Sequence, residues 1–235
     1  GHLGEMRSPT QYPLAKDVVR WQGEPVAVVV ANKRAVAEDA LELVEIDYED
    51  LDAQLDMETA MDKSTKVIHD DLGNNLFWTR TVNQGDVSQA FKQSHIVEEV
   101  TLDFARHTGV TLETRAIVAD WDSSEERMTI YHNGQAPHMM QSIIAKHLNI
   151  SEGLVRIISC DVGGSFGIKV HVYPDEMVTV AVSKLLKRPV KFVADRLESY
   201  STDIHSRCHK ISGKIGVDDK GKILAFEIDD LSGIG

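Results

Sequence analysis

The sequence predicts an α+β fold, and three features of its pattern lead to this class. Strands and helices alternate along the chain, but no single βα period repeats. A short apolar strand that begins at Val155 runs into a glycine-rich loop and then, after Pro174, into a helical stretch. Near the C-terminal end, two strands flank the sequence DDKG at residues 218–221, which is typical of a hairpin turn.

The first 55 residues are expected to form a partial βαβ unit. Residues 17–22 and 26–31 are predicted strands, and the second is wholly apolar and β-branched, as in strands that are buried on both faces. A helix with Asn32 as its N-cap follows, and residues 44–48 return to strand alternation.

Residues 56–84 show no periodicity and are expected to be an extended linker. A second domain, residues 85–235, is predicted to follow. Asp86 and Gln89 have the spacing of a capping box at the start of a short helix. The other elements expected here are strands at residues 96–104, 115–121 and 128–131, a helix at 136–148, a strand from 155, a helix at 175–186, and strands at 189–194, 210–217 and 222–229.

Composition and charge exclude several kinds of partner. The 235 residues carry a formal net charge of −12 and no basic run, so nucleic acid is not an expected partner. No apolar stretch approaches the roughly 20 residues that span a bilayer, and no signal-peptide pattern is present, so we expect a cytoplasmic protein without membrane attachment. The two cysteines, Cys160 and Cys208, form no CxxC pair, so any iron–sulfur relay is expected on another chain.

The glycine-rich loop GGSFG, residues 163–167, is the strongest local signal. Paired glycines permit positive φ and remove side-chain bulk, so that successive backbone N–H groups can point at one bound group, as at phosphate sites. The loop is therefore a candidate ligand cradle. A strained turn without a ligand explains such a cluster equally well when it is considered in isolation.

Five segments occur in a fixed order around this loop. They are WQGEPVAVVVA, AVAEDALELVEIDYEDL, QGDVSQAF, the stretch from YHNGQ through GGSFG, and DRLES. Together they resemble the molybdenum-cofactor subunits of the xanthine oxidase, aldehyde oxidoreductase and aerobic carbon monoxide dehydrogenase family, over essentially residues 13–233. The resemblance implies a partial α/β hammerhead domain in residues 1–55, and a truncated, mixed-sheet first molybdopterin-binding domain in residues 85–235.

The resemblance also implies a cofactor site. The residues implied to bind the cofactor are Gln135, Gly163, Gly164, Ser165, Phe166 and Gly167. In the family pattern the glutamine and the backbone N–H at Phe166 contact oxo ligands of molybdenum, and neither binds the metal directly. An amide side chain such as Gln135 suits this place because it offers both a donor and an acceptor. Ser165 replaces a more usual third glycine, so either φ is negative there or the loop differs from the family's.

Other charged residues receive structural interpretations. Glu113 is expected to be a strand-edge carboxylate that pairs with Arg115 or Arg106. The segment HSRCH, residues 205–209, supplies three side chains of the kind that bind metals. In a strand, however, Cys208 faces away from the two histidines, so we interpret the segment as structural.

Three further residues concern the surroundings of the loop. Arg196 and Glu198 are expected to form an ion pair beneath the loop, and Lys169 to support it in a similar way. Purine-oxidising members of the family carry a carboxylate after the loop's lysine, where this chain has Val170, so the resemblance disfavours purine oxidation.

The function that the resemblance implies is that of a molybdenum-dependent oxidoreductase. The chain is expected to be part of a large subunit that oxidises or hydroxylates carbon monoxide, an aldehyde or an N-heterocycle. The cofactor implied is molybdopterin, in its cytosine dinucleotide form, with molybdenum. The partners implied are the remaining part of the molybdenum subunit, an FAD-binding subunit and a [2Fe–2S] subunit.

The sequence begins Gly-His and is expected to be a fragment that is inactive by itself, because the family's catalytic glutamate lies in later segments. The alternative is a non-catalytic module that binds a nucleotide or phosphate through GGSFG. Against it, Ser165 and Ile168 occupy positions where the dinucleotide-binding pattern GxGxxG needs glycine.

Overall fold

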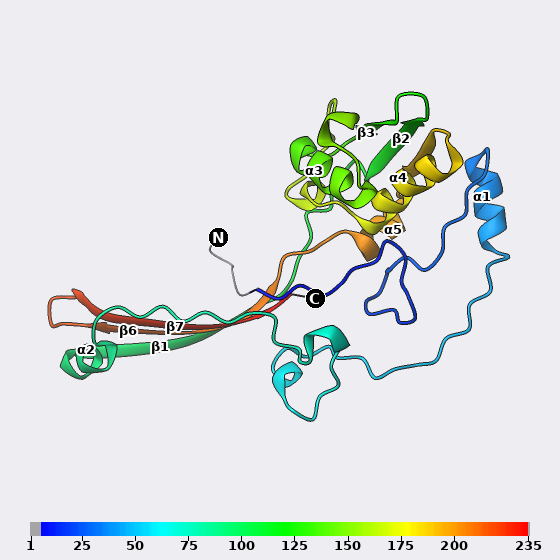
Figure 1. Ribbon diagram of the computed structural model, residues 1–235. Coiled ribbons are helices and arrows are strands. Elements are labelled where there is room, and N and C mark those ends of the chain that lie inside the picture. Colours follow the sequence, from blue (N-terminus) through cyan, green and yellow to red (C-terminus); the bar gives the residue numbers. More distant parts are fainter. Residues whose placement is uncertain (1–5, 235) are drawn as a thin grey trace. The chain divides into compact units, whose positions relative to one another are not determined.

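The computed structural model describes residues 6–234, which form two compact units (Figure 1). Unit 1 comprises the described residues up to Thr10, Asp50–His107, and the chain from Ser206 onward. Unit 2 comprises Gln11–Glu49 and Thr108–His205. The second stretch of unit 2 is thus inserted into unit 1, and at the junction the N–H of Ser206 donates to the carbonyl of His107 at 2.7 Å.

Unit 1 is built on an antiparallel sheet with the order β1-β6-β7. Its elements are η1 (Thr59–Met61), η2 (Asp70–Leu72), α2 (Val87–Gln93), β1 (Ile96–Phe104), β6 (Cys208–Val217) and β7 (Ile223–Gly233). The Asp86 side chain caps α2 by accepting from the N–H of Gln89 at 2.9 Å, as the sequence predicted. Helix α2 packs on the sheet at Gly216, where an added Cβ would lie 3.0 Å from the ring of Phe91.

Unit 2 is built on a mixed four-stranded sheet with the order β4-β3-β2-β5. Its elements are α1 (Arg34–Leu41), β2 (Ala116–Asp122), β3 (Arg127–His132), α3 (Pro137–Leu148), η3 (Glu152–Leu154), β4 (Val155–Ile158), η4 (Ile168–Val170), α4 (Pro174–Leu186), β5 (Val190–Val193) and α5 (Arg196–Thr202). Strands β3 and β4 run parallel and the other pairs antiparallel. The α+β class expected from the sequence is therefore confirmed.

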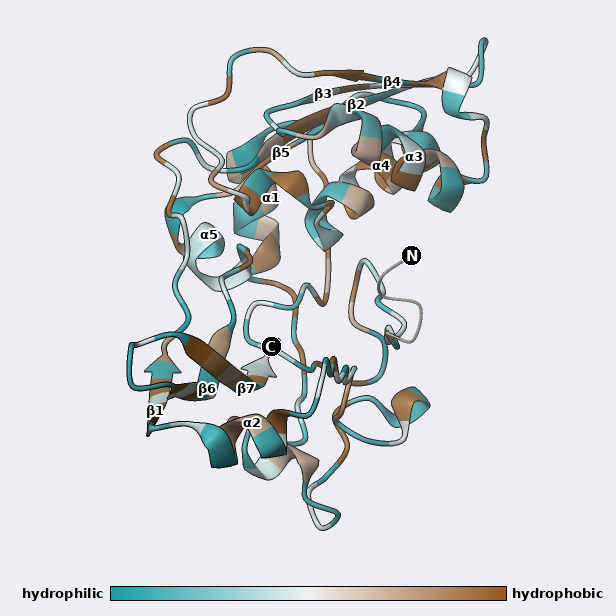
Figure 2. Cartoon of the chain, turned by 90° about the vertical axis from the view of Figure 1, so that its left-hand side faces the viewer, coloured by the Kyte–Doolittle hydropathy of each residue, from teal (hydrophilic) through white to brown (hydrophobic). Residues whose placement is uncertain are grey.

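The core of unit 2 lies between this sheet and the helices α3 and α4, which cover one of its faces (Figure 1). Alternate residues of β2 point into the core, so Ile117 and Ala119 are buried while their neighbours are partly exposed. Ile144 of α3 and Val180 of α4 pack against them. Hydrophobic residues accordingly mark β5 and both helices in Figure 2. Burying each large apolar side chain contributes about 1.5–3 kcal/mol.

The segment from β3 through α3 to β4 is a βαβ crossover, which parallel strands require. Pro137 starts α3 without losing a needed hydrogen bond, and Asn149 ends it in the left-handed conformation, φ 54°. Because β3 and β4 are parallel neighbours, the chain leaves both at the same edge of the sheet. Gln135 follows β3 and the glycine loop follows β4, so the crossover places them together.

The N-terminal part of unit 2 differs from the expectation. Helix α1 is present and begins after Lys33 rather than Asn32, but the strands expected at residues 17–22, 26–31 and 44–48 are not formed. The expected burial of residues 26–31 is wrong, since Val28 is 44% exposed. A strand is stable only when its backbone groups are paired, and the described residues give this segment no strand partner.

The stretch DRLES, residues 195–199, forms the start of helix α5, with Asp195 as its N-cap. Asp195 and Glu198 form a capping box at the start of α5, each side chain accepting from the other's backbone N–H at 2.7 Å. The expected Arg196–Glu198 ion pair is therefore wrong. Arg196 instead donates to the carbonyl of Leu112 at 2.7 Å.

Residues 56–84 contain only the two short helices η1 and η2. The expected division into a domain of residues 1–55, a linker of residues 56–84 and a domain of residues 85–235 stays a prediction. The structure separates into two compact units, and each of them is discontinuous in sequence. Within residues 6–234 no helix combines the length and apolar character needed to cross a membrane.

Candidate functional site

The candidate site lies where β3 and β4 end, and its first component is the loop after β4. Gly164 and Gly167 have φ of 99° and 89°, in the region that favours glycine. Phe166 adopts φ 51° and the residue is 80% exposed, so it is not a core residue of unit 2. Ser165 does not have a positive φ, so its backbone conformation is one that serine adopts without strain.

The second component is Gln135, which is bound directly to the loop. Its side-chain oxygen accepts from the hydroxyl of Ser165 and from the N–H of Gly167, the latter at 3.3 Å. Its own backbone N–H donates to the carbonyl of Lys169 at 3.1 Å. The residues that the sequence predicted as one site are therefore brought together, and the serine that departs from the usual pattern adds a contact.

A third component, Glu113, was not predicted to belong here. One of its carboxylate oxygens accepts from the backbone N–H of Gly163 and from the ammonium of Lys169, each at 2.7 Å. The expected pairing with Arg115 or Arg106 is wrong, because Lys169 is its ion-pair partner. Burial raises the pKa of Glu113, but the hydrogen bonds from Lys169 and Gly163 outweigh it and hold that pKa below its ordinary value.

Beneath the loop lies a buried network around Arg115, whose side chain is 1% exposed. Its guanidinium makes a two-bond contact with Asp175, at 2.6 and 2.7 Å, and a further bond to Asp203 at 2.7 Å. The guanidinium also stacks 3.8 Å from the ring centre of Tyr173. Burial lowers the pKa of Arg115, yet its carboxylate partners raise it above the ordinary value.

Tyr173 connects this network to the loop. Its hydroxyl donates to the carbonyl of Ile168 at 2.8 Å and accepts from the N–H of Ile204 at 3.2 Å. Burial raises the pKa of the phenol, which stays protonated as the donor. Next to it, Glu176 accepts from the N–H of Tyr173 and contacts the buried ring of His132 at 2.9 Å. The C-terminal end of the loop is therefore fixed from below.

Comparison with known proteins identifies the family. The profile of the molybdopterin cofactor-binding domain matches residues 68–235. The chain belongs to the molybdopterin-binding large subunits of the xanthine oxidase family. The profile of the aldehyde oxidase and xanthine dehydrogenase a/b hammerhead domain matches residues 2–52 of this chain.

Three known proteins illustrate the similarity. The nicotine 6-hydroxylase large subunit of Paenarthrobacter nicotinovorans is 35% identical over 89% of this chain and 26% of its own length. The carbon monoxide dehydrogenase large chain of Hydrogenophaga pseudoflava is 31% identical over 92% of this chain and 28% of its own. The crystal structure of quinoline 2-oxidoreductase from Pseudomonas putida 86 superposes with a TM-score of 0.90 at 30% identity, over 96% of this chain and 29% of that one. The chain thus spans less than a third of these relatives.

The glycine loop fits an oxygen-rich ligand. The N–H groups of Gly163, Gly167 and Lys169 are bonded within the site. The backbone N–H groups of residues 164–166, which lie between Gly163 and Gly167, have no hydrogen-bond acceptor in the described part of the chain. Successive unpaired donors in a loop with changing sign of φ form a concavity that suits oxygen ligands. The space beside Gly167 is open, since an added Cβ would meet nothing within 4 Å.

The other candidates from the sequence do not join this site. No group of three or more His, Cys, Asp or Glu side chains among residues 6–234 is placed to hold a metal ion. In the segment HSRCH, His209 pairs with Asp230 at 2.9 Å and Cys208 contacts the sulfur of Met57 at 3.7 Å. Strand β6 begins at Cys208, so only the last two residues of this segment are strand, and its structural interpretation stays a prediction.

A cavity of about 260 Å³ lies on the face of the unit 2 sheet that α3 and α4 leave open. Its polar lining includes Glu113, Asn133, Cys160, Asp161 and Lys191. Sequence reasoning did not place these residues around one cavity, because they come from separate strands and loops. Glu113 lines this cavity and also accepts from the N–H of Gly163 in the glycine loop.

Proposed function

We propose that this chain forms one wall of the molybdopterin site in the large subunit of a molybdenum-dependent oxidoreductase. The observation that carries the proposal is the direct contact of Gln135 with the glycine loop, beside three successive N–H groups without an acceptor. Membership of the molybdopterin-binding family supports it. The roles of the individual residues are part of the proposal.

In this proposal each residue has a separate task toward the cofactor. The oxygen of Gln135 is used by the loop, so its amide NH₂ group is the part that donates to a ligand oxygen on the metal. The N–H of Phe166 is a second donor, and Gly164 leaves room for the cofactor's approach. When bound, molybdopterin with molybdenum supplies two-electron oxidation of a substrate carbon. The chain contributes orientation and fixed hydrogen-bond donors.

The finer features of the function are also proposals. We propose a small substrate, which is carbon monoxide, an aldehyde or an N-heterocycle, and Val170 disfavours a purine. Nicotine 6-hydroxylase and quinoline 2-oxidoreductase, two of the relatives, carry N-heterocycles in their names. The proposed partners are the rest of the large subunit, an FAD-binding subunit and a [2Fe–2S] subunit. The proposed cofactor is the cytosine dinucleotide form of molybdopterin, and the proposed location of the complex is the cytoplasm. The chain alone is proposed to be inactive. The alternative of a nucleotide- or phosphate-binding module finds no support in the comparisons.

The test compares two variants of the full-length subunit in its complex. Gln135→Ala is expected to keep its molybdenum, because the glutamine contacts a ligand of the metal rather than the pterin. Its turnover is expected to fall by about 100-fold, the lower end of what losing one oriented donor costs, because water can replace the amide in part. Gly164→Val is expected to lose molybdenum and turnover together, since a β-branched residue opposes φ 99° and its Cβ would lie 3.2 Å from the ring of Phe166, which distorts the loop.

The matched control is Gly221→Val in the β6–β7 turn. Gly221 also has positive φ, 81°, so the backbone strain is comparable, but it lies in unit 1 and outside the loop. We expect this control to keep its metal content. Full turnover in Gln135→Ala together with full molybdenum in Gly164→Val would show that this wall is not at the metal.

A further inference from the structure

Glu113 connects the two ends of the glycine loop through a single oxygen atom. That oxygen accepts from the N–H of Gly163, where the loop begins, and from the ammonium of Lys169, just after it ends. The backbone adds a third link, because the N–H of Glu113 donates to the carbonyl of Gly163 at 3.2 Å. The chain between these two points carries the three N–H groups that have no acceptor.

Because Lys169 is buried, its ammonium needs the ion pair with Glu113. The Lys169 side chain is 1% exposed, whereas that of Glu113 is 41% exposed. A buried ammonium without a partner is strongly destabilising, so the lysine fixes the position of the carboxylate. Lys169 also receives the backbone N–H of Gln135 on its carbonyl, and its own N–H donates to the Ser165 hydroxyl at 3.2 Å. It therefore contacts both components of the site.

The packing at Gly163 shows how closely the carboxylate side chain approaches the loop. A Cβ added to Gly163 would lie 2.5 Å from the Cβ of Glu113, which is closer than real contacts permit. Gly163 does not have positive φ, so glycine is required here by space rather than by backbone conformation. Gly163, the first residue of the loop, is thus in close van der Waals contact with Glu113 as well as hydrogen-bonded to it.

We propose that Glu113 and Lys169 are positioning residues that hold both ends of the loop, so that the free N–H groups of residues 164–166 face one ligand. The nature of that ligand rests on the proposed function. Neither residue donates to the ligand. Glu113 and Lys169 act through the backbone of the loop. An exposed ion pair with no such role would contribute little to stability and nothing to the order of the loop.

The experiment uses the full-length subunit in its complex, with and without cofactor. The variants are Glu113→Gln, Glu113→Ala and the double variant Glu113→Ala/Lys169→Met. Hydrogen exchange of the peptide that spans residues 161–168 reports loop order, and metal analysis reports molybdenum. Glu113→Gln retains an acceptor for Gly163 and is expected to change exchange least. Glu113→Ala leaves a buried cation unpaired, so a lower melting temperature is expected there in addition to faster exchange.

The double variant separates positioning from stability. Removing both charges leaves no buried cation, so its melting temperature is expected to return toward that of the parent. Gly163 still lacks an acceptor, so exchange in the loop is expected to stay about 10- to 100-fold faster than in the parent. Molybdenum content is expected to fall with it.

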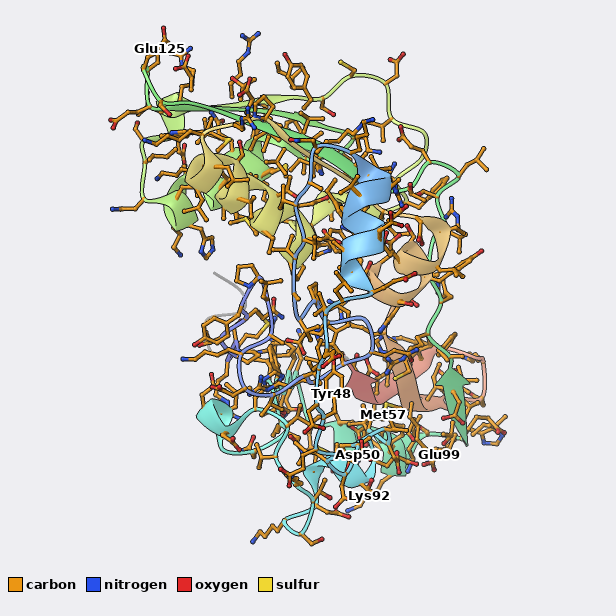
Figure 3. All side chains as sticks on the ribbon, turned by 90° about the vertical axis from the view of Figure 1, so that its right-hand side faces the viewer. Tyr48, Asp50, Met57, Lys92, Glu99 and Glu125 are labelled. Carbon is orange, nitrogen blue, oxygen red and sulfur yellow. The ribbon has the colours of Figure 1, made fainter. Side chains whose placement is uncertain are left out.

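The control is Glu125→Gln. Figure 3 shows Glu125 at the turn between β2 and β3, where its carboxylate is 62% exposed and lies 3.6 Å from Arg127. This variant is expected to leave loop exchange and molybdenum unchanged. The proposal is overturned if loop exchange in the double variant is as slow as in the parent. It is also overturned if exchange is faster but molybdenum content and turnover equal those of the parent. If the parent complex holds no molybdenum while loop exchange still responds as expected, the positioning role stands and the proposed function fails.

Discussion

Replacing Arg115 with methionine tests whether the buried network holds unit 2 together. The side chain is 1% exposed and joins the start of β2 to Asp175 at the start of α4 and to Asp203 after α5. Methionine matches much of its apolar bulk but makes none of its hydrogen bonds. Three carboxylates, those of Asp175, Asp203 and, at 3.9 Å, Glu176, therefore remain without their cation.

The expected magnitude follows from the partners that are left behind. Breaking a buried ion pair by removing one member costs about 3–5 kcal/mol. We expect about 3 kcal/mol here, because Asp175 lies in the first turn of α4, where the helix dipole stabilises a negative charge in part. With a urea m value of about 2 kcal/mol/M, the unfolding midpoint falls by about 1.5 M.

The assay is urea unfolding of the 235-residue chain, followed by circular dichroism and by fluorescence that includes the buried Trp121. The control is Arg127→Met, which removes an exposed arginine, 46% accessible, whose contact with Glu125 is 3.6 Å long. We expect the control to cost less than about 1 kcal/mol. If both variants unfold at the same midpoint, the network does not stabilise unit 2 and the argument from burial is refuted.

Two further predictions concern the loop. Gly163→Ala is expected to destabilise the chain by about 1–3 kcal/mol through its clash with Glu113, whereas Gly167→Asn is expected to cost less than about 1 kcal/mol, since asparagine tolerates positive φ and the space there is open. Urea unfolding of both checks this, and equal losses would contradict it. The pKa of Glu113 is lowered in the folded chain, so its stabilising contribution is complete above the ordinary glutamate pKa of about 4.3 and is lost as pH falls through the lowered value. The stability difference between the parent and Glu113→Gln should therefore shrink as the pH falls below about 4.3, and a difference that is independent of pH would exclude the ionic contact.

The sequence was most informative where local patterns decide the structure. Strand alternation, the capping residue Asp86 and the turn at residues 218–221 each act within a few positions, and α2, β1, β6 and β7 lie close to where these patterns predicted them. The proximity of Gln135 to the glycine loop was also predictable, because one crossover separates them. Their roles toward a cofactor stay predictions.

The failures have physical causes. An apolar run such as residues 26–31 indicates a strand only if a partner strand is available, and the pattern carries no information about the partner. The helix at DRLES could have been found, because Asp195 and Glu198 have capping-box spacing. The Glu113–Lys169 contact could not, since the two residues are far apart in sequence and neither pattern around them requires the other.

The insertion of residues 108–205 between β1 and β6 has a consequence for how the protein folds. Before unit 2 forms, pairing β1 with β6 must close a loop of about 100 disordered residues, at a large entropic cost. Once unit 2 is compact its ends meet, as the bond between His107 and Ser206 shows, and the same pairing closes only a short gap. The sheet of unit 1 should therefore assemble late, after the glycine loop's own unit. A substitution in the core of unit 2 would then delay strand pairing in the sheet of unit 1.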